Sequence, residues 1–538
     1  MNARMIRVAL LSTLAWSMLC LLPATALAAS GHAGGQLQEI LQNPADAGMS
    51  TELDWKKLRK FYASRHYQPA WSDHSGVFLP ARQFRDILEN ADREGLEPKS
   101  YHLKSIARQW GSIHAAKRAR LDLLLTDAFF LYSRHVSQGR YAPFEVDPLW
   151  NIDVPQMDPV ALLESMLEED DFERALQALA PPHPGYRWLR EALKKYRQLA
   201  AQGGWPTIRT SAILKYGQRH AQVAVLRRRL MAEGDLQLPA VHDAQYFDQL
   251  LKYAVERFQV RHGLEMDGLV GAGTRAALNV PVSTRIEQIK LNMERWRWLP
   301  GELGERYIMV NTANFELLAF DKNKPVLGMS VITGKPERPT PVIQGMLHTL
   351  VLNPYWTLPR TIAIEDVLPK QQRNPEYLTS KGIHVFANGE ELDPRQIDWS
   401  KADEDYFPYI LRQEPGPDNA LGRFKFLFSN NFDIYLHDTP SYWKFDQAMR
   451  AFSSGCIRVQ EPFKLVSYLL RSQSEWSEQA IKAATRSGEN RRIPIPDALP
   501  VYLVYFTAWG RSDGTTSFYR DVYDLDQTNP AFCLTSNP

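Results

Sequence analysis

The chain has 538 residues, of which 44% are hydrophobic, 23% charged and 11% aromatic. This balance is that of a soluble globular protein with several domains, and it excludes low-complexity disorder, collagen and polytopic membrane proteins. The formal net charge of +2 argues against a nucleic-acid partner, and only three cysteines (Cys20, Cys456 and Cys533) exclude a disulfide scaffold.

The first 29 residues have the pattern of a secretory signal peptide. Arg4 and Arg7 precede an apolar run from Val8 to Leu22, and Ala26-Leu27-Ala28 is a small-x-small cleavage motif. The alternative is a membrane anchor, which would be the chain's only membrane contact, but the run is shorter than the roughly 20 residues of a spanning helix. We therefore predict export and cleavage, which would leave a mature chain with equal numbers of basic and acidic residues.

A helical scaffold domain is predicted over residues 30–205. Its first part, residues 30–48, is rich in Gly, Gln and Ala and is typical of a flexible leader. From Thr51 to about Arg197, apolar residues recur at three- and four-residue steps, and prolines interrupt the pattern. No chemistry is visible in this region, so we expect a structural role.

Residues 206–283 predict a small helical module. An Asp267-Gly268 turn favours positive φ, and Thr274 is predicted to cap the last short helix. The string FQ-x-x-HGL-x-x-DG-x-x-G-x-x-T-x-x-ALN, which begins at Phe258, resembles the peptidoglycan-binding domain 1 family. That resemblance implies glycan binding, although an insertion around residues 235–249 departs from the family pattern and leaves open whether the module still binds glycan.

The pattern becomes β from Arg306 onward, in a domain predicted over residues 284–515. An irregular, charged segment at about residues 358–409 is predicted to be an insertion that serves as a lid. Residues 516–538 are predicted to be a C-terminal tail. The predicted fold class is therefore multidomain α+β, with a mostly-β domain that carries an inserted capping subdomain. The expected strands are Tyr307–Val310, Phe315–Phe320, Val326–Thr333, Met346–Leu352, Phe424–Phe428, Phe432–His437 and Tyr502–Phe506.

Chemistry is concentrated between His437 and Arg458. His437 ends a predicted strand, and Cys456 follows in a Ser-Ser-Gly loop. A thiol becomes a nucleophile as its thiolate, and a nearby imidazole is the usual means of producing it. Gly455 lets a substrate approach main-chain N–H groups that could stabilise an oxyanion. Arg458 adds positive charge that favours the thiolate or binds a carboxylate.

Two other interpretations of Cys456 follow from composition alone. A lone cysteine is more often a buried, unreactive residue than a nucleophile. A disulfide with Cys533 is the second alternative, and sequence does not decide its redox state.

The motif Ser453-Ser454-Gly455-Cys456-Ile457-Arg458, with His437 before it, resembles the signature of the YkuD-type L,D-transpeptidase catalytic domain. Thr333-Gly334-Lys335, Arg338–Pro341 and Leu352–Pro359 are similar to that family as well. The order of the predicted domains, and the run Arg65–Trp71, more narrowly resemble the large YcbB-type enzymes of Gram-negative bacteria.

The resemblance implies a role for each residue of the motif. Cys456 matches the family nucleophile, His437 its general base and Gly455 its oxyanion-hole loop. Asp438 occupies the position that orients the imidazole, through either its side chain or its carbonyl. Ser454 stands where many relatives have a second histidine. The residues expected to shape the substrate site are Arg458, Ser454, Tyr355 and Trp356.

The function implied is that of a periplasmic peptidoglycan L,D-transpeptidase involved in cell-wall biogenesis and cell shape. It would form 3→3 cross-links between diaminopimelate residues through a cysteinyl thioester, with no metal or cofactor, and carbapenems would acylate its thiol. Its partners would be stem peptides, glycan and other cell-wall synthases. The acceptor (a stem peptide, a lipoprotein or a free D-amino acid) and the oligomeric state stay open. Two alternatives are a hydrolytic cysteine peptidase and a non-catalytic wall-binding assembly factor.

Overall fold

The computed structural model describes residues 24–45, 48–50, 52–237 and 242–526, with side chains from residue 33 onward. The hydrophobic run of the predicted signal peptide, Cys20 and Cys533 therefore lie outside the described residues. The chain divides into two compact units, which we describe separately: Met1–Ala91, Glu97–Ser133 and Met157–Gln177 form the first, and the rest forms the second. Within the described residues, no helix is both long enough and apolar enough to cross a membrane.

The first unit is helical, as predicted. Its core is aromatic, with Trp71 stacked on Phe84 and in edge contact with Phe172. The predicted flexible leader is wrong in part, because Leu37 and Leu41 are buried on a helix that begins at Ala24. The elements are α1 (Ala24–Gln42), α2 (Trp55–Ser64), β1 (Ser72–Asp73), β2 (Gly76–Val77), α3 (Leu79–Glu89), η2 (Pro98–Ser100), α4 (Leu103–Gln109), most of α5 (Ala115–Ser137), α7 (Pro159–Leu167) and α8 (Phe172–Gln177).

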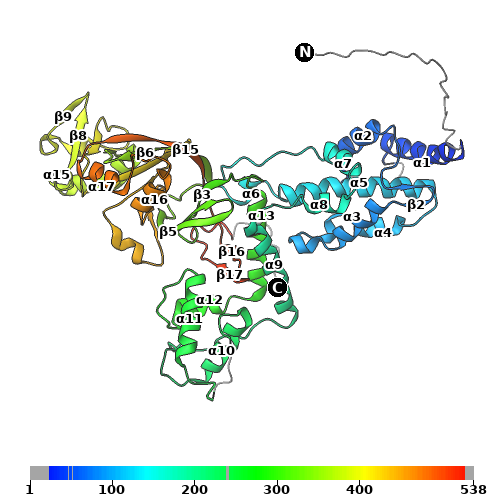
Figure 1. Ribbon diagram of the computed structural model, residues 1–538, viewed down its shortest axis with the longest axis horizontal. Coiled ribbons are helices and arrows are strands. Elements are labelled where there is room, and N and C mark those ends of the chain that lie inside the picture. The colour runs from blue at the N-terminus through cyan, green and yellow to red at the C-terminus, as the bar shows by residue number, and fades with distance from the viewer. Residues whose placement is uncertain (1–23, 46–47, 51, 238–241, 527–538) are drawn as a thin grey trace, which may run out of the picture. The chain divides into compact units, whose positions relative to one another are not determined.

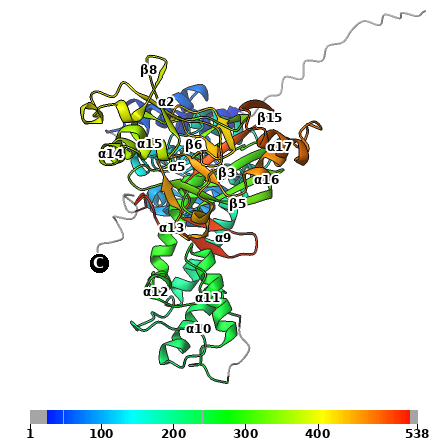
Figure 2. The same ribbon diagram turned by 90° about the vertical axis from the view of Figure 1, so that its left-hand side faces the viewer.

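In the second unit, the small helical module is built around one glutamine side chain. Gln259 donates to Asp267 and Thr274 and accepts from the amide of Gly268, whose φ is +69°. The predicted Asp-Gly turn is confirmed, but the prediction for Thr274 is wrong: Gly271 is the N-cap, and Thr274 lies inside the helix as a partner of Gln259. The helices of this unit are η1 (Ala91–Glu94), α6 (Pro143–Val146), α9 (Pro184–Ala201), α10 (Ala221–Glu233), α11 (Gln249–Arg261), α12 (Ala272–Leu278) and α13 (Val282–Arg297). Figure 1 and Figure 2 both show α10, α11 and α12 grouped together.

The main sheet has the strand order β13-β5-β14-β12-β11-β6-β15-β3-β4, and β4 also pairs with β5. One apolar core, which includes Phe426, Leu436 and Ile457, packs beneath it together with α16 (Pro462–Leu469) and α17 (Glu478–Arg486). The strands are β3 (Arg306–Asn311), β4 (Glu316–Asp321), β5 (Lys324–Gly334), β6 (Ile343–Leu352), β11 (Phe424–Phe428), β12 (Leu436–His437), β13 (Ala451–Ser453), β14 (Ile457–Val459) and β15 (Arg491–Val504). The predicted mostly-β domain and the α+β class are confirmed.

The strand predicted at Phe432–His437 is shorter than expected. The side chain of Asn430 accepts hydrogen bonds from the amides of Phe432 and Ile434, and Asp433 has a φ of +53°. These contacts bend the backbone, so only Leu436–His437 joins the sheet.

The inserted segment is an ordered subdomain rather than an irregular lid. It has its own sheet, in the order β7-β10-β8-β9, and its own core, which includes Leu368, Val385 and Trp399. Figure 1 shows β8, β9 and α15 together in one yellow lobe. Its elements are β7 (Trp356–Thr357), η3 (Ile362–Val367), α14 (Leu368–Arg373), α15 (Tyr377–Ser380), β8 (Ile383–Ala387), β9 (Glu390–Leu392), η4 (Pro394–Gln396), η5 (Trp399–Lys401) and β10 (Ile410–Gln413).

The predicted C-terminal tail is also corrected. Residues 516–526 belong to the folded unit, because β17 (Thr516–Phe518) pairs with β16 (Ala508–Gly510) and Asp526 forms a buried ion pair with Arg295 at 2.7 Å. Phe518, Tyr519 and Leu525 of this segment are buried in the core of the second unit.

Candidate active site

The loop that carries Cys456 is held tightly between β13 and β14. Ser453 Oγ accepts from the amide of Gly455 (3.1 Å) and donates to the carbonyl of Cys456 (2.6 Å). Thr340 Oγ1 donates to the carbonyl of Gly455 (2.7 Å). Gly455 has a φ of +117°, which residues with a Cβ rarely adopt. These bonds fix the loop, and Cys456 itself stays part-exposed.

The register of two short strands brings the imidazole to this loop. β12 runs parallel to β14, with Leu436 opposite Ile457 and His437 opposite Arg458. Leu436 and Ile457 enter the core, so His437 and Arg458 lie on the other face of the sheet. Cys456 directly precedes β14, packs in part against this core, and is close enough to Lys425 and Arg458 for their charges to act on its thiol.

His437 is oriented by the main chain. Its Nδ1 donates to the carbonyl of Asp438 at 2.5 Å, because a carbonyl can only accept. The second ring nitrogen, Nε2, is therefore left with a free lone pair. Burial and, next, the charge of Arg458 lower the pKa of His437 to about 3. The imidazole is neutral near pH 7 and can accept a proton.

The side chain of Asp438 does not contact His437 and instead binds groups of the surrounding turn. Its carboxylate accepts from the amides of Arg423 (2.8 Å) and Thr439 (2.7 Å) and from the hydroxyl of Tyr442 (2.5 Å). The sequence left open whether the side chain or the carbonyl of Asp438 orients His437. In the structure, the carbonyl makes this contact. The carboxylate instead fixes the turn that presents this carbonyl.

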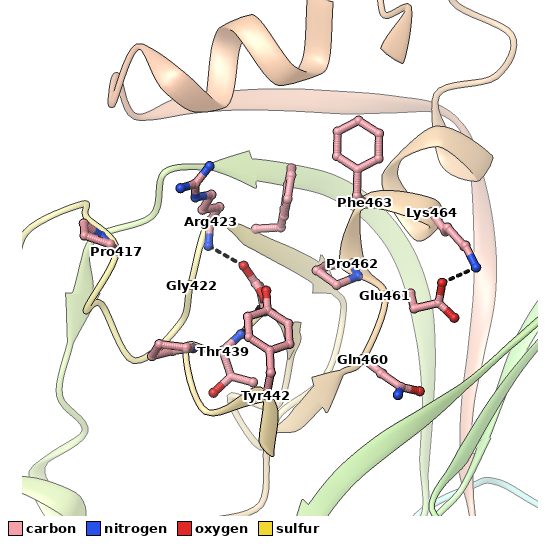
Figure 3. A pocket seen from close by; sticks show the side chains of 13 residues that line it. Pro417, Gly422, Arg423, Thr439, Tyr442, Gln460, Glu461, Pro462, Phe463 and Lys464 are labelled. Atoms are coloured by element: carbon pink, nitrogen blue, oxygen red, sulfur yellow. Dashed lines mark hydrogen bonds and ion pairs between the residues drawn. The ribbon is translucent and has the colours of Figure 1, made fainter. Parts of the chain in front are cut away.

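A cavity of about 560 Å³ lies at this turn, at the end of β12 away from Cys456. Figure 3 shows Tyr442 and Arg423 on one side of it and Phe463 and Lys464 on the other. Lys464 forms an ion pair with Glu461 there.

The thiol of Cys456 is protonated at rest. Burial raises its pKa, while a hydrogen bond from Tyr435 and the charges of Lys425 and Arg458 act in the opposite direction. Its Sγ lies 3.8 Å from the carbonyl of Asp433. The arrangement is thus a thiol with a neutral base nearby, in which the proton moves as the nucleophile attacks.

Sequence reasoning missed Tyr435 and Lys425. Lys425 lies directly opposite His437 on β11, and its Nζ is 3.8 Å from the centre of the Tyr435 ring. Two signals could have found them. Lys425 is the polar residue in an alternating Phe-Lys-Phe strand, and Tyr435 is two residues before the histidine.

Gly455 does not act as an oxyanion donor in this structure, because its amide is engaged by Ser453. The amide of Cys456 has no acceptor among the described residues and is the better candidate. The contribution of Gly455 is its backbone conformation.

The other three predicted residues make contacts with groups other than the thiol and the imidazole. Ser454 Oγ accepts from Arg338 (3.0 Å), which also binds Asp366 of the inserted subdomain. Tyr355 is exposed beside Arg412, and Trp356 packs on the core of the inserted subdomain. Among the described residues, no group of three or more His, Cys, Asp or Glu side chains is placed to hold a metal ion.

Family models match three parts of the chain. Residues 305–482, which include the thiol loop and His437, match the L,D-transpeptidase catalytic domain called YkuD. The chain therefore contains a YkuD-type L,D-transpeptidase catalytic domain. Residues 219–278 match the "Putative peptidoglycan binding domain", and residues 56–193 match a Scaffold domain. The predicted catalytic family and the kind of module are confirmed. Apart from the corrected C-terminal tail, the predicted domain bounds stay predictions, as does the narrower YcbB-type resemblance.

Single proteins are similar to parts of the chain. A Haemophilus influenzae protein named "Putative L,D-transpeptidase" is 36% identical over 242 residues, which are 45% of this chain and 48% of the relative. The chain thus spans about half the length of this curated relative.

Solved structures are more distant. The L,D-transpeptidase of Xylanimonas cellulosilytica (residues 123–326) is 16% identical and covers 55% of this chain and 98% of its own, with a TM-score of 0.19. The L,D-transpeptidase of Stackebrandtia nassauensis is 13% identical and covers 49% and 90%, with a TM-score of 0.21. The assignment of the domain therefore rests on the sequence matches.

Proposed function

We propose that the protein is a peptidoglycan L,D-transpeptidase that forms 3→3 cross-links between diaminopimelate residues of two stem peptides. The register of β12 against β14 carries the proposal, because it sets a neutral His437 beside the loop of Cys456 inside a domain that matches this catalytic family. A buried, oriented imidazole next to a thiol is the arrangement that acyl transfer needs.

In the first half-reaction, Nε2 of His437 takes the Sγ proton as the sulfur attacks the carbonyl carbon of the third residue of a tetrapeptide stem. The amide of Cys456, which has no acceptor among the described residues, supplies a donor for the oxyanion. The C–N bond to the terminal D-alanine then breaks. The leaving amine takes the proton from His437, and a thioester remains.

In the second half-reaction, the side-chain amine of a diaminopimelate from another stem attacks the thioester carbonyl. His437 takes a proton from this amine, the C–S bond breaks, and the proton returns to the thiolate of Cys456. The product is a new amide bond, and the protein ends in its starting state.

The test is to incubate the purified protein with tetrapeptide muropeptides and to look for 3→3 dimers by mass spectrometry. We expect dimers and released D-alanine from the wild type and none from Cys456→Ala. Full activity in Cys456→Ala would overturn the proposal. Release of D-alanine with tripeptide as the sole product, even with excess acceptor, would favour a hydrolytic peptidase, and binding to sacculi without any thioester would favour a wall-binding factor.

We further propose that the protein works in the periplasm after export and that carbapenems acylate Cys456. The signal-like pattern of residues 1–29 supports the first proposal, and the part-exposed thiol supports the second. N-terminal sequencing of the secreted protein tests the cleavage, and intact mass after carbapenem exposure tests acylation.

A further inference from the structure

Two cations at the candidate active site have no anionic partner. Within the described residues, no carboxylate lies within ion-pair distance of Lys425 or Arg458, and Nε of Arg458 is buried without an acceptor. Burial lowers the pKa of both side chains, and only the thiolate form of Cys456 would oppose this shift. Removing cations from water without pairing them is unfavourable, so an anion from outside the chain would stabilise them.

The sheet register places these two cations on either side of the base. Lys425 of β11 and Arg458 of β14 are the direct neighbours of His437 of β12, one from each side. All three side chains lie on the face opposite the apolar core. Cys456, in the loop before β14, is close enough for electrostatic interaction with both cations. An anion held by both cations would therefore sit beside the thiol and the imidazole.

Neighbouring side chains do not supply the missing negative charge. Burial lowers the pKa of Lys444, and the positive charge of nearby Arg458 lowers it further. The carboxylate of Asp438 is engaged by two amides and a hydroxyl. Asp433 is exposed, and although its charge acts on Lys425, it forms no ion pair with it. The site thus has an excess of positive charge close to the nucleophile.

We propose that Lys425 and Arg458 form a subsite for the free C-terminal carboxylate of the donor peptide, that is, of the residue that leaves. This inference rests on the proposed function. In a peptide cleaved before its last residue, only the amide nitrogen and one Cα separate the reacting carbonyl carbon from the terminal carboxylate carbon, a distance of roughly 4 Å. Because both cations interact electrostatically with Cys456, a carboxylate this close to the carbon that Cys456 attacks would be attracted by both. The subsite would select donors whose next residue is the last.

The test compares two donors that differ in one group, a tetrapeptide stem with a free C-terminal carboxylate and the same tetrapeptide as its C-terminal amide. Binding of each to the full-length Cys456→Ala protein is measured by calorimetry, so that the result does not depend on turnover. We expect the acid to bind about 10- to 100-fold more tightly than the amide. The double variant Lys425→Gln/Arg458→Gln, in the same background, should bind the two equally by losing affinity for the acid alone.

Two further variants test whether positive charge at this position is what binds the acid. Arg458→Lys keeps the charge and should retain part of the preference, whereas Lys482→Gln removes a lysine on α17, which packs on the opposite face of the sheet, and should retain all of it. Equal binding of acid and amide to the Cys456→Ala protein, or an equal loss for both donors in the double variant, would overturn the proposal. Failure of the proposed function would show separately, as no D-alanine release by the wild type.

Discussion

His437 is held by the carbonyl of the residue that follows it, with 2.5 Å between His437 Nδ1 and Asp438 O. The carboxylate of the same aspartate points elsewhere and holds the turn. One residue therefore supports the base with its main chain and the loop with its side chain. A side-chain substitution at Asp438 should act on the site only through that turn.

Substitutions at positions 437 and 438 should therefore differ. We expect His437→Ala to lower kcat by about 10²–10⁴-fold, because the base is lost. Asp438→Asn keeps the carbonyl and one acceptor oxygen, so we expect a loss below about 10-fold. Steady-state D-alanine release measures both. A loss in Asp438→Asn as large as that in His437→Ala would mean that the carboxylate takes part in proton transfer.

Thr340 links two loops of the site. Its hydroxyl accepts from the amide of Gly334 (2.9 Å) and donates to the carbonyl of Gly455 (2.7 Å). Thr340→Val keeps the shape but leaves two buried polar groups without partners, at a cost of about 1–3 kcal/mol each. We expect lower stability in urea unfolding, and a fall in kcat larger than the change in KM. Thr340→Ser should restore both. If Thr340→Val matched the wild type in both measurements, the link would be unimportant.

Arg338 connects the inserted subdomain to the nucleophile loop. Its guanidinium binds Glu365 and Asp366 on η3 and Ser454 Oγ in the loop. We expect Arg338→Ala to increase proteolysis within residues 358–409 and to lower kcat by about 10-fold, from loss of charge-assisted hydrogen bonds.

Ser454→Ala serves as the matched control for that prediction, because it removes only the contact with the loop. Its inserted subdomain should resist protease as the wild type does. Equal proteolysis of Arg338→Ala and wild type would show that other contacts hold the subdomain in place.

A buried ion network anchors the peptidoglycan-binding module. Glu233 accepts from Arg229 (2.6 Å), Arg261 (3.0 Å) and Tyr196 (2.6 Å), and Arg261 also donates to the carbonyl of Thr516. Burial alone would raise the pKa of Glu233, but the two arginines hold it well below its usual value. We expect Glu233→Gln to cost about 3–5 kcal/mol, because buried Arg229 loses its counter-charge and Arg261 keeps only Asp235. Urea unfolding followed by tryptophan fluorescence measures this. The variant Asp398→Asn, which breaks an exposed ion pair with Lys401, should leave the unfolding free energy nearly unchanged.

Buried histidines should make the second unit sensitive to acid. Burial lowers the pKa of His437 and of His135 to about 3, against 6.5 in the unfolded chain. A lowered pKa means that the unfolded state binds these protons first, so stability is full above pH 6.5 and is lost as the pH falls toward 3. Each histidine contributes a slope of up to about 1.4 kcal/mol per pH unit within this window.

Thermal melting between pH 7.5 and pH 5 tests this expectation. The melting temperature should fall with pH, and His135→Gln should reduce the slope. His114→Gln, at an exposed position, should leave the slope unchanged. A slope that is the same in His135→Gln and in the wild type would show that His135 does not contribute to it.

The sequence by itself determined which residues could carry chemistry and which segments could form strands. A cysteine after a glycine and a histidine at a strand end are local features, and the alternation of Phe424–Phe428 depends only on the geometry of an extended chain. The Asp267-Gly268 turn was equally local, since positive φ favours glycine.

The tertiary structure decided the contacts between residues distant in sequence. Whether Asp438 offers its carbonyl or its carboxylate, and whether the amide of Gly455 is free, depends on where the turn and the Ser453 hydroxyl come to lie. Lys425 became a neighbour of His437 only through the pairing of β11 with β12. Hydrogen bonds and charge interactions act over a few ångströms, so strand register rather than sequence spacing determines which side chains meet.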